Sequence, residues 1–306
     1  MLRQAILAAS RNGTVKRAVA GAPLSRRVVR RFVAGESADD AVRATAALQA
    51  QGLAVSLDHL GEDTTDAGQA AATVRAYELL LGRLADAGLS QQGRAEVSVK
   101  LTAVGQAISE QLALDSARTV CEAAAAAGTT VTLDMEDHTT TDSTLRVLHA
   151  LRADFPGTGA VLQAYLRRTE EDCRALAVEG SRVRLCKGAY KEPEAVAYQS
   201  PGEVARAYVR CLRILMAGPG YPMVASHDPA MVAEATRLAQ DRRPDSYEFQ
   251  MLYGIRPMEQ SRLAAAGCTV RVYVPYGDEW YGYLMRRLAE RPANLAFFLR
   301  ALASRS

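Results

Sequence analysis

The chain has 306 residues, of which 49% are hydrophobic and 23% charged, a balance typical of a globular protein and not of a disordered one. Its 37 basic and 34 acidic residues give a net charge of +3, too close to balance to indicate nucleic acid as a partner. Five scattered cysteines without a CxxC pair argue against a disulfide framework and against a zinc site, and predict reduced cytosolic thiols.

The first 31 residues are basic and contain no Asp or Glu. This composition resembles a mitochondrial transit peptide, but the segment continues into residues 30–36 without a processing-like break. That continuity favours a basic amphipathic helix of the mature protein. No secretory signal is visible, and no apolar run reaches the roughly 18 residues needed to span a bilayer. We therefore expect residues 1–50 to form helices that pack on the rest of the chain.

From residue 53 onward, short strand-like runs alternate with helix-like runs. Each strand-like run contains β-branched or aromatic residues and is flanked by Gly, Pro or Asp. Ala-, Leu-, Arg- and Glu-rich stretches of helical period lie between them, over residues 69–87, 109–126, 203–216 and 229–240. The predicted strands span residues 53–61, 96–105, 129–136, 159–167, 182–190, 221–228, 247–254 and 268–277.

This alternation over residues 53–294 predicts an α/β fold, a closed (β/α)8 TIM-like barrel with extra N-terminal helices. An open, doubly wound parallel sheet is the alternative. Because the composition does not change along the chain, we expect residues 1–306 to form one domain, with residues 1–50 as a helical extension. Active sites of such barrels lie at the C-terminal ends of the strands, so polar residues there are candidates for function.

Polar residues do recur where successive predicted strands end. One buried polar group is ordinary in a barrel, but repetition on strand after strand indicates a site. Lys100, Arg184 and Lys187 would repel one another unless anions lie among them. Asp134 can offset one charge, so the pattern predicts a bound anionic cofactor or substrate. The strand-end candidates are Lys100, Asp134, Glu136, His138, Gln163, Arg184, Lys187, Tyr190, Ser226, His227, Asp228, Gln250 and Tyr273.

Two other patterns suit anions. Residues 187–189, Lys-Gly-Ala, lie at the end of the predicted strand 182–190, where a small backbone beside a lysine suits a phosphate group. The last predicted helix carries Arg286 and Arg287 on a face shared with Tyr283, and an arginine pair suits bidentate binding of a carboxylate. An ordinary turn and a solvated basic surface are the respective alternatives.

The residues alone leave several functions open. A lysine at a strand end can form a Schiff base, which would make the protein a lyase, but this leaves the other cations unexplained. Asp134, Glu136 and His138 share one face of an extended strand and could bind a metal with His227, although many positive groups lie nearby. A barrel that binds a carboxylate metabolite without catalysis is the third possibility.

Segments along most of the chain resemble the proline dehydrogenase family in its short, monofunctional bacterial form. RLCKGAY (184–190) and YLMRRLAE (283–290) are the most specific of them. The resemblance implies a distorted (β/α)8 barrel that binds FAD non-covalently. It also implies oxidation of L-proline to Δ1-pyrroline-5-carboxylate, the first step of proline catabolism to glutamate. The other resembling segments are 97–105, 133–138, 161–172, 225–229, 247–257 and 270–277.

The resemblance also implies roles for single residues. Asp134 would lie beside flavin and substrate and help to order Lys100, and Arg184 would lie near the flavin N5 edge. Glu62 would pair with Arg286 as a gate over the substrate. The implied substrate contacts are Lys100, Tyr190, Leu252, Tyr273, Tyr283, Arg286 and Arg287. The implied FAD contacts are Met135, Gln163, Arg184, Lys187, Gly188, Ala189, Ser226 and His227.

The resemblance further implies partners and a location. Electrons would pass to a quinone-type acceptor at the membrane surface, and a separate pyrroline-5-carboxylate dehydrogenase would take the product. The expected location is the cytoplasm, with peripheral contact at the inner face of the membrane. The basic N-terminal segment or residues 295–299 could make that contact, with core packing as the alternative for both. No metal ion and no nucleic acid are expected.

Overall fold

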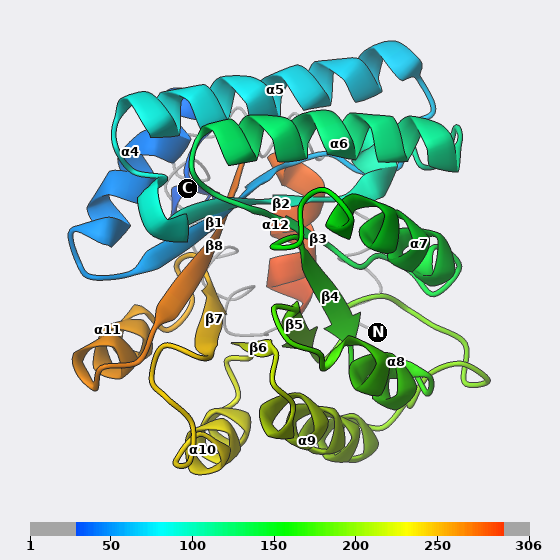
Figure 1. Ribbon diagram of the computed structural model, residues 1–306, viewed down its shortest axis with the longest axis vertical. Helices are drawn as coiled ribbons and strands as arrows, with labels where there is room; N and C mark the ends of the chain where they lie inside the picture. The colour runs from blue at the N-terminus through cyan, green and yellow to red at the C-terminus, as the bar shows by residue number, and fades with distance from the viewer. Residues whose placement is uncertain (1–28, 291–306) are drawn as a thin grey trace, which may run out of the picture.

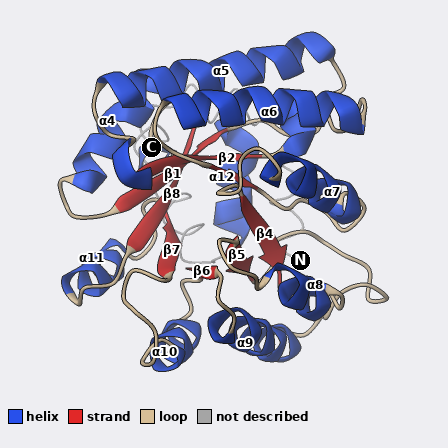
Figure 2. Ribbon diagram, in the orientation of Figure 1, coloured by secondary structure: helices blue, strands red, loops and turns tan. Residues whose placement is uncertain are grey.

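The computed structural model describes the backbone of residues 29–290 and the side chains of residues 29–285. Eight parallel strands form a closed barrel in the order of the sequence, and β8 pairs with β1 to complete it (Figure 1, Figure 2). The predicted barrel is therefore confirmed and the open sheet is wrong. The strands are β1 (Ala54–His59), β2 (Ala95–Val99), β3 (Val131–Leu133), β4 (Gly159–Gln163), β5 (Arg182–Cys186), β6 (Tyr221–Ala225), β7 (Glu248–Leu252) and β8 (Val270–Tyr276).

Helices surround the barrel, and α12 lies inside their ring at the end where the strands finish (Figure 1). Two short 3-10 helices, η1 (Gln91–Gly93) and η2 (Leu101–Val104), flank β2. None of the described helices is both long and apolar enough to cross a membrane. The α-helices are α4 (Ala38–Gln49), α5 (Ala67–Asp86), α6 (Glu110–Ala126), α7 (Thr141–Arg152), α8 (Thr169–Leu176), α9 (Pro201–Ala217), α10 (Pro229–Leu238), α11 (Pro257–Ala265) and α12 (Trp280–Glu290).

The helices begin where the sequence offers caps. Ser37 and Ser200 form capping boxes with Asp40 and Glu203, and they start α4 and α9. Asp228 accepts a hydrogen bond from the Ala230 amide and starts α10, whose first residue is a proline. The four helices predicted by period are confirmed as α5, α6, α9 and α10. Helix α4 agrees with the predicted N-terminal extension, whereas residues 1–28 and 295–299 lie outside the described residues.

Alternation along the strands explains the core. Apolar residues such as Val97 and Val99 in β2 are fully buried in the main hydrophobic cluster. The residues that alternate with them, Glu96 and Ser98, are also fully buried but make polar contacts inside the barrel. Successive side chains of a strand point to opposite faces, so this barrel is apolar outside and polar inside over much of its length.

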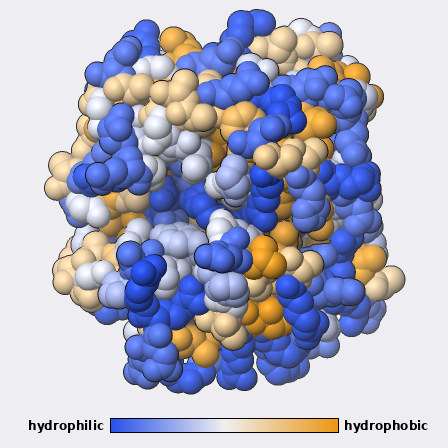
Figure 3. Space-filling view, in the orientation of Figure 1, coloured by the Kyte–Doolittle hydropathy of each residue, from blue (hydrophilic) through white to orange (hydrophobic). Residues whose placement is uncertain are grey.

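The observed strands are shorter than predicted. β3 covers only Val131–Leu133, against the prediction of 129–136, and β5 ends at Cys186 instead of residue 190. Much of the strand-end polar sequence therefore lies in βα loops, which are not constrained to a strand's alternation. Hydrophilic residues gather around a hollow near the centre of the face shown in Figure 3.

Candidate active site

A cavity of about 620 Å³ opens at the C-terminal end of the barrel. This volume is in the range of ligand-binding pockets, about 300–1,000 Å³. All eight strands or the loops after them contribute to its wall, and α12 adds Tyr283. The lining residues are Asp58, Lys100, Asp134, Met135, Val161, Gln163, Arg184, Cys186, Lys187, Gly188, Ala189, Tyr190, Ala225, Ser226, His227, Asp228, Pro229, Gln250, Met251, Leu252, Tyr273 and Tyr283.

Lys100 is held by Asp58 of β1. Its Nζ lies 2.6 Å from both carboxylate oxygens of Asp58, and both residues are buried. Burial by itself would lower the pKa of Lys100, but Asp58 and then Asp134 outweigh burial and raise it. Lys100 is therefore a fixed positive charge at the cavity wall.

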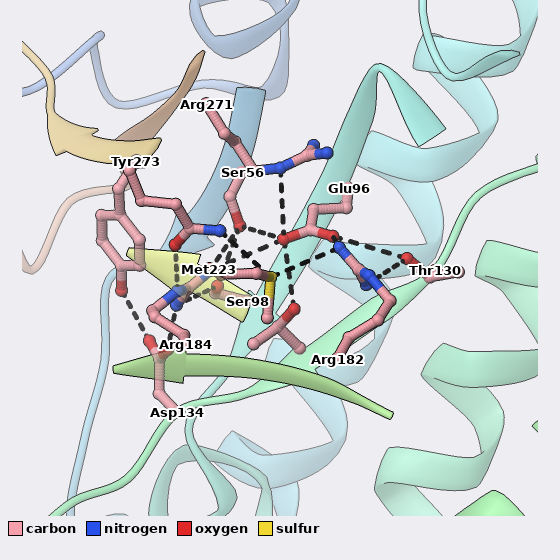
Figure 4. Close-up of polar contacts among 12 residues, drawn as sticks. Ser56, Glu96, Ser98, Thr130, Asp134, Arg182, Arg184, Met223, Arg271 and Tyr273 are labelled. Carbon is pink, nitrogen blue, oxygen red and sulfur yellow. Dashed lines mark hydrogen bonds and ion pairs between the residues drawn. The ribbon is translucent and has the colours of Figure 1, made fainter. Parts of the chain in front are cut away.

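Asp134, which follows the neighbouring strand β3, organises the next part of the wall. One carboxylate oxygen accepts a hydrogen bond from Nη1 of Arg184 at 2.6 Å, and the other accepts one from the Tyr273 hydroxyl at 2.7 Å (Figure 4). Burial, then Asp134, raises the pKa of Tyr273 well above its ordinary value, so the hydroxyl keeps its proton. The direct ion pair with Lys100 comes from Asp58, and Asp134 acts on Lys100 through its charge, so the expected role of Asp134 in ordering Lys100 stays a prediction.

Lys187 also lines the cavity and lies beside the start of α10. Its Nζ is 2.6 Å from Asp228 Oδ2, and the hydrogen bond from Lys187 lowers the pKa of Asp228. The neighbouring His227 accepts a hydrogen bond from the Leu252 amide through Nε2 at 2.9 Å, which fixes its ring against β7. A lysine beside a helix N-terminus is a suitable surface for a phosphate group.

These pairs change one inference from the sequence. Lys100, Arg184 and Lys187 each have a carboxylate partner from the chain, namely Asp58, Asp134 and Asp228. The repulsion among these three cations therefore does not require a bound anion, contrary to the expectation from the sequence, because a carboxylate of the chain already offsets each charge. The cavity still presents cations, but the chain itself compensates them.

The structure also separates the residues of the metal hypothesis. Asp134 faces the cavity, whereas Glu136 accepts hydrogen bonds from Thr102 and His138 is paired with Glu192. β3 ends before all three, so they do not share a strand face. Within residues 29–285, no group of three or more His, Cys, Asp or Glu side chains is placed to hold a metal ion.

A Schiff-base mechanism finds no support at Lys100. An amine nucleophile must lose its proton, and enzymes that use lysine this way lower its pKa. Here the ion pair with Asp58 raises the pKa of Lys100 and keeps it protonated.

Most of the predicted site residues meet in this one cavity. Glu62, in the loop after β1, is exposed and does not belong to its lining, so the gate remains a prediction. The side chains of Arg286 and Arg287 lie outside the described residues, although the backbone of α12 extends to Glu290. The predicted residues in the lining are Lys100, Asp134, Met135, Gln163, Arg184, Lys187, Gly188, Ala189, Tyr190, Ser226, His227, Leu252, Tyr273 and Tyr283.

Asp58 is the main residue that the sequence analysis missed. It is the next-to-last residue of β1 and has 1% exposure, yet it was not among the strand-end candidates. The signal was present, since an aspartate at the end of a predicted barrel strand satisfies the same criterion as Asp134.

Comparison with known proteins gives one consistent result. A family model described as proline dehydrogenase matches residues 41–300. The chain is 38% identical to proline dehydrogenase 1 of Bacillus subtilis over 99% of both chains. It is 40% identical to proline dehydrogenase of Deinococcus radiodurans over 89% of both chains. Among solved structures it resembles proline utilization A of Bdellovibrio bacteriovorus, with a TM-score of 0.78 and 27% identity over 86% of this chain and 32% of that one.

Proposed function

Because the chain belongs to the proline dehydrogenase family and oxidises proline to Δ1-pyrroline-5-carboxylate, we propose that it uses FAD for this reaction. The FAD would be bound non-covalently in the barrel cavity. One observation carries the proposal. A single cavity of about 620 Å³, lined by residues from all eight strands or the loops after them, brings together a buried lysine, an Arg–Asp–Tyr cluster and a lysine beside a helix N-terminus.

The residues present fit a flavin nucleotide. Lys187 and the N-terminus of α10 supply a positive end for phosphate groups. Gly188 adopts a φ of +112° and its Cα packs directly against the ring of Tyr165, where a Cβ would overlap. Met135 and Gln163 add an apolar and an amide side chain to the cavity lining. When bound, FAD would accept a hydride from proline.

Other residues suit the substrate. Lys100 would contribute to binding the proline carboxylate, and the predicted Arg286 and Arg287 would complete that clamp. Tyr190, Leu252, Tyr273 and Tyr283 all line the cavity and would form a wall around a small rigid ring, and such a wall would also exclude water. Binding the carboxylate at one end while confining the ring at the other would orient the reacting carbon, on which hydride transfer depends.

Arg184 and Asp134 would support the redox step without contacting the carboxylate. A guanidinium near the flavin favours the more negative reduced state. Asp134 fixes Arg184 and Tyr273 simultaneously, so one carboxylate sets the positions of both side chains.

A flavin spectrum tests the proposal. Purified protein should be yellow, and L-proline added without oxygen should bleach the flavin absorbance. A colourless protein that takes up no FAD would contradict it. Arg287→Met should raise the KM for proline steeply while FAD stays bound, and loss of FAD would contradict the role given to that arginine.

The acceptor and pathway partners are also part of the proposal. Electrons would go to a membrane quinone, and a separate pyrroline-5-carboxylate dehydrogenase would oxidise the product. The protein would be cytoplasmic and would meet the membrane peripherally. Quinone-dependent proline oxidation by isolated membranes mixed with the purified protein tests the first point.

A further inference from the structure

Glu96 of β2 lies inside the barrel below the cavity, with no exposed surface. Its carboxylate forms ion pairs with three arginines, at 2.5 Å from Arg182, 3.6 Å from Arg184 and 3.8 Å from Arg271. Figure 4 shows Glu96 at the centre of these contacts. Glu96 is not in the cavity lining, so it takes no part in the site described above.

Two hydrogen-bonded routes connect Arg184 to this deeper layer. In the first, Ser56 accepts from Nη2 of Arg184 at 3.1 Å and donates to Glu96 at 3.1 Å. In the second, Gln250 accepts from Nε of Arg184 and donates to Glu248, which pairs with Arg271 at 2.8 Å. Both routes end on Arg271, because Arg271 also approaches Glu96.

The charges of this network balance. Arg182, Arg184 and Arg271 contribute three positive charges, and Glu96, Glu248 and Asp134 contribute three negative ones. Burial alone would raise the pKa of Glu96, but Arg182, Arg271 and Arg184 together overcome burial and lower it to about 2. Glu96 is therefore ionised, and removing its charge leaves one buried positive charge uncompensated.

Filling a barrel does not require such a network. Branched apolar side chains usually fill the interiors of these barrels. Buried ion pairs are often no more stabilising than well-packed apolar residues of similar volume. The network also reaches the cavity at Arg184, whose guanidinium lies over the Tyr273 ring at 5.3 Å. Its connection to a cavity residue points to a role beyond packing.

We propose that Glu96 is a positioning residue for proline oxidation, which fixes Arg184 from below and sets how much positive charge Arg184 presents to the bound flavin. The inference rests on the proposed function, in which Arg184 lies beside the flavin. Asp134 holds Arg184 from the cavity side and Glu96 from the opposite side, so each carboxylate offsets part of the same charge.

The flavin midpoint potential of Glu96→Gln tests the proposal. The variant keeps the shape of the side chain and removes its charge, so Arg184 should favour reduced flavin more strongly. The ratio of reduced to oxidised flavin at a fixed potential should rise about tenfold, which corresponds to about 30 mV for a two-electron couple. Thr132→Val is the matched control, because it removes another hydrogen bond to Glu96 at 3.1 Å without touching Arg184. Its potential should match that of the wild type.

If Glu96→Gln lowers the melting temperature but leaves the flavin midpoint potential unchanged, the proposal is overturned. Equal shifts of the midpoint potential in Glu96→Gln and Thr132→Val would also overturn it. If Glu96→Gln does not fold, Ser56→Ala decides, since it breaks the hydrogen-bonded route through which Glu96 fixes Arg184 and leaves every charge and the ion pair at 3.6 Å in place. It should lower kcat several-fold with little change in the KM for proline, and an unchanged kcat would overturn the proposal. A wild-type protein that proline does not bleach would instead contradict the proposed function.

Discussion

Lys100 and Asp58 form an ion pair inside the barrel, with the Lys100 ammonium bridging both oxygens of the Asp58 carboxylate. The pair joins the end of β1 to the residue that follows β2, and these strands are neighbours in the barrel. It leaves Lys100 charged and fixed in orientation at the cavity wall. A substrate carboxylate would therefore meet a cation whose position is already set, which reduces the entropy lost on binding.

The Asp58–Lys100 pair should show strong energetic coupling. Asp58→Asn and Lys100→Met should each lower the free energy of unfolding by about 3–5 kcal/mol, because each leaves one buried charge unpaired. The loss of unfolding free energy in the double variant should be clearly smaller than the sum of the losses in the two single variants. Urea unfolding of all four proteins measures the coupling, and additive losses would show that the pair is not energetically linked.

Glu136 should make stability depend on pH. Burial raises the pKa of Glu136 to about 7, against hydrogen bonds from Thr102 that act in the opposite direction. A carboxyl group whose pKa is higher in the folded state stabilises the protein when protonated. That contribution is complete below the unfolded pKa near 4.5 and is lost as the pH rises through about 7.

Glu136→Gln should remove this dependence. Between pH 4.5 and pH 8, the free energy of unfolding of the variant should rise by about 3 kcal/mol relative to that of the wild type, because the pKa of Glu136 is raised from 4.5 to about 7. Urea unfolding at both pH values measures the difference. The same relative stability at the two pH values would show that Glu136 titrates normally.

Gly188 should not tolerate a side chain. Its φ is +112°, and a Cβ there would overlap the ring of Tyr165. Gly180 provides a matched control, since it has a φ of +74° but no neighbouring atom within 4 Å of the position that a Cβ would occupy. Gly180→Ala should lower the free energy of unfolding by about 1–2 kcal/mol, from backbone strain alone.

Gly188→Ala should lower the free energy of unfolding by about 1–3 kcal/mol more than Gly180→Ala, because the added methyl group overpacks the site. It should also weaken FAD binding, because the cavity wall must move. Thermal unfolding and the flavin content of the purified variants measure both effects. Equal losses of unfolding free energy in the two variants would mean that the Tyr165 ring moves aside without an energetic penalty.

Asp228 should compete with a bound anion for Lys187. Asp228→Asn keeps an oxygen to cap α10 but removes the charge that pairs with Lys187 at 2.6 Å. This variant should bind FAD more tightly, whereas Lys187→Met should bind it more weakly. Fluorescence titration of the apoprotein with FAD at low and high salt measures both affinities. Weaker binding by Asp228→Asn would contradict the placement of the phosphate groups beside Lys187.

Much of the architecture follows from local sequence. Short runs such as 182–186 are rich in β-branched or apolar residues and alternate with stretches of helical period, and this pattern is sufficient to predict a barrel. The position of the site at the C-terminal ends of the strands follows from the fold class, so the sequence alone indicates Asp134 and Arg184 as site residues. The family resemblance adds the chemistry.

Only the tertiary structure decided which charges meet. Asp58 and Lys100 are 42 residues apart, and Arg184 contacts Ser56 across 128 residues. Alternation along a strand predicts which side chains point inward, but the partner across a barrel depends on its closure and on the register of every strand. The sequence therefore showed a surplus of cations at the strand ends, whereas the folded barrel supplies each of these cations with its own carboxylate.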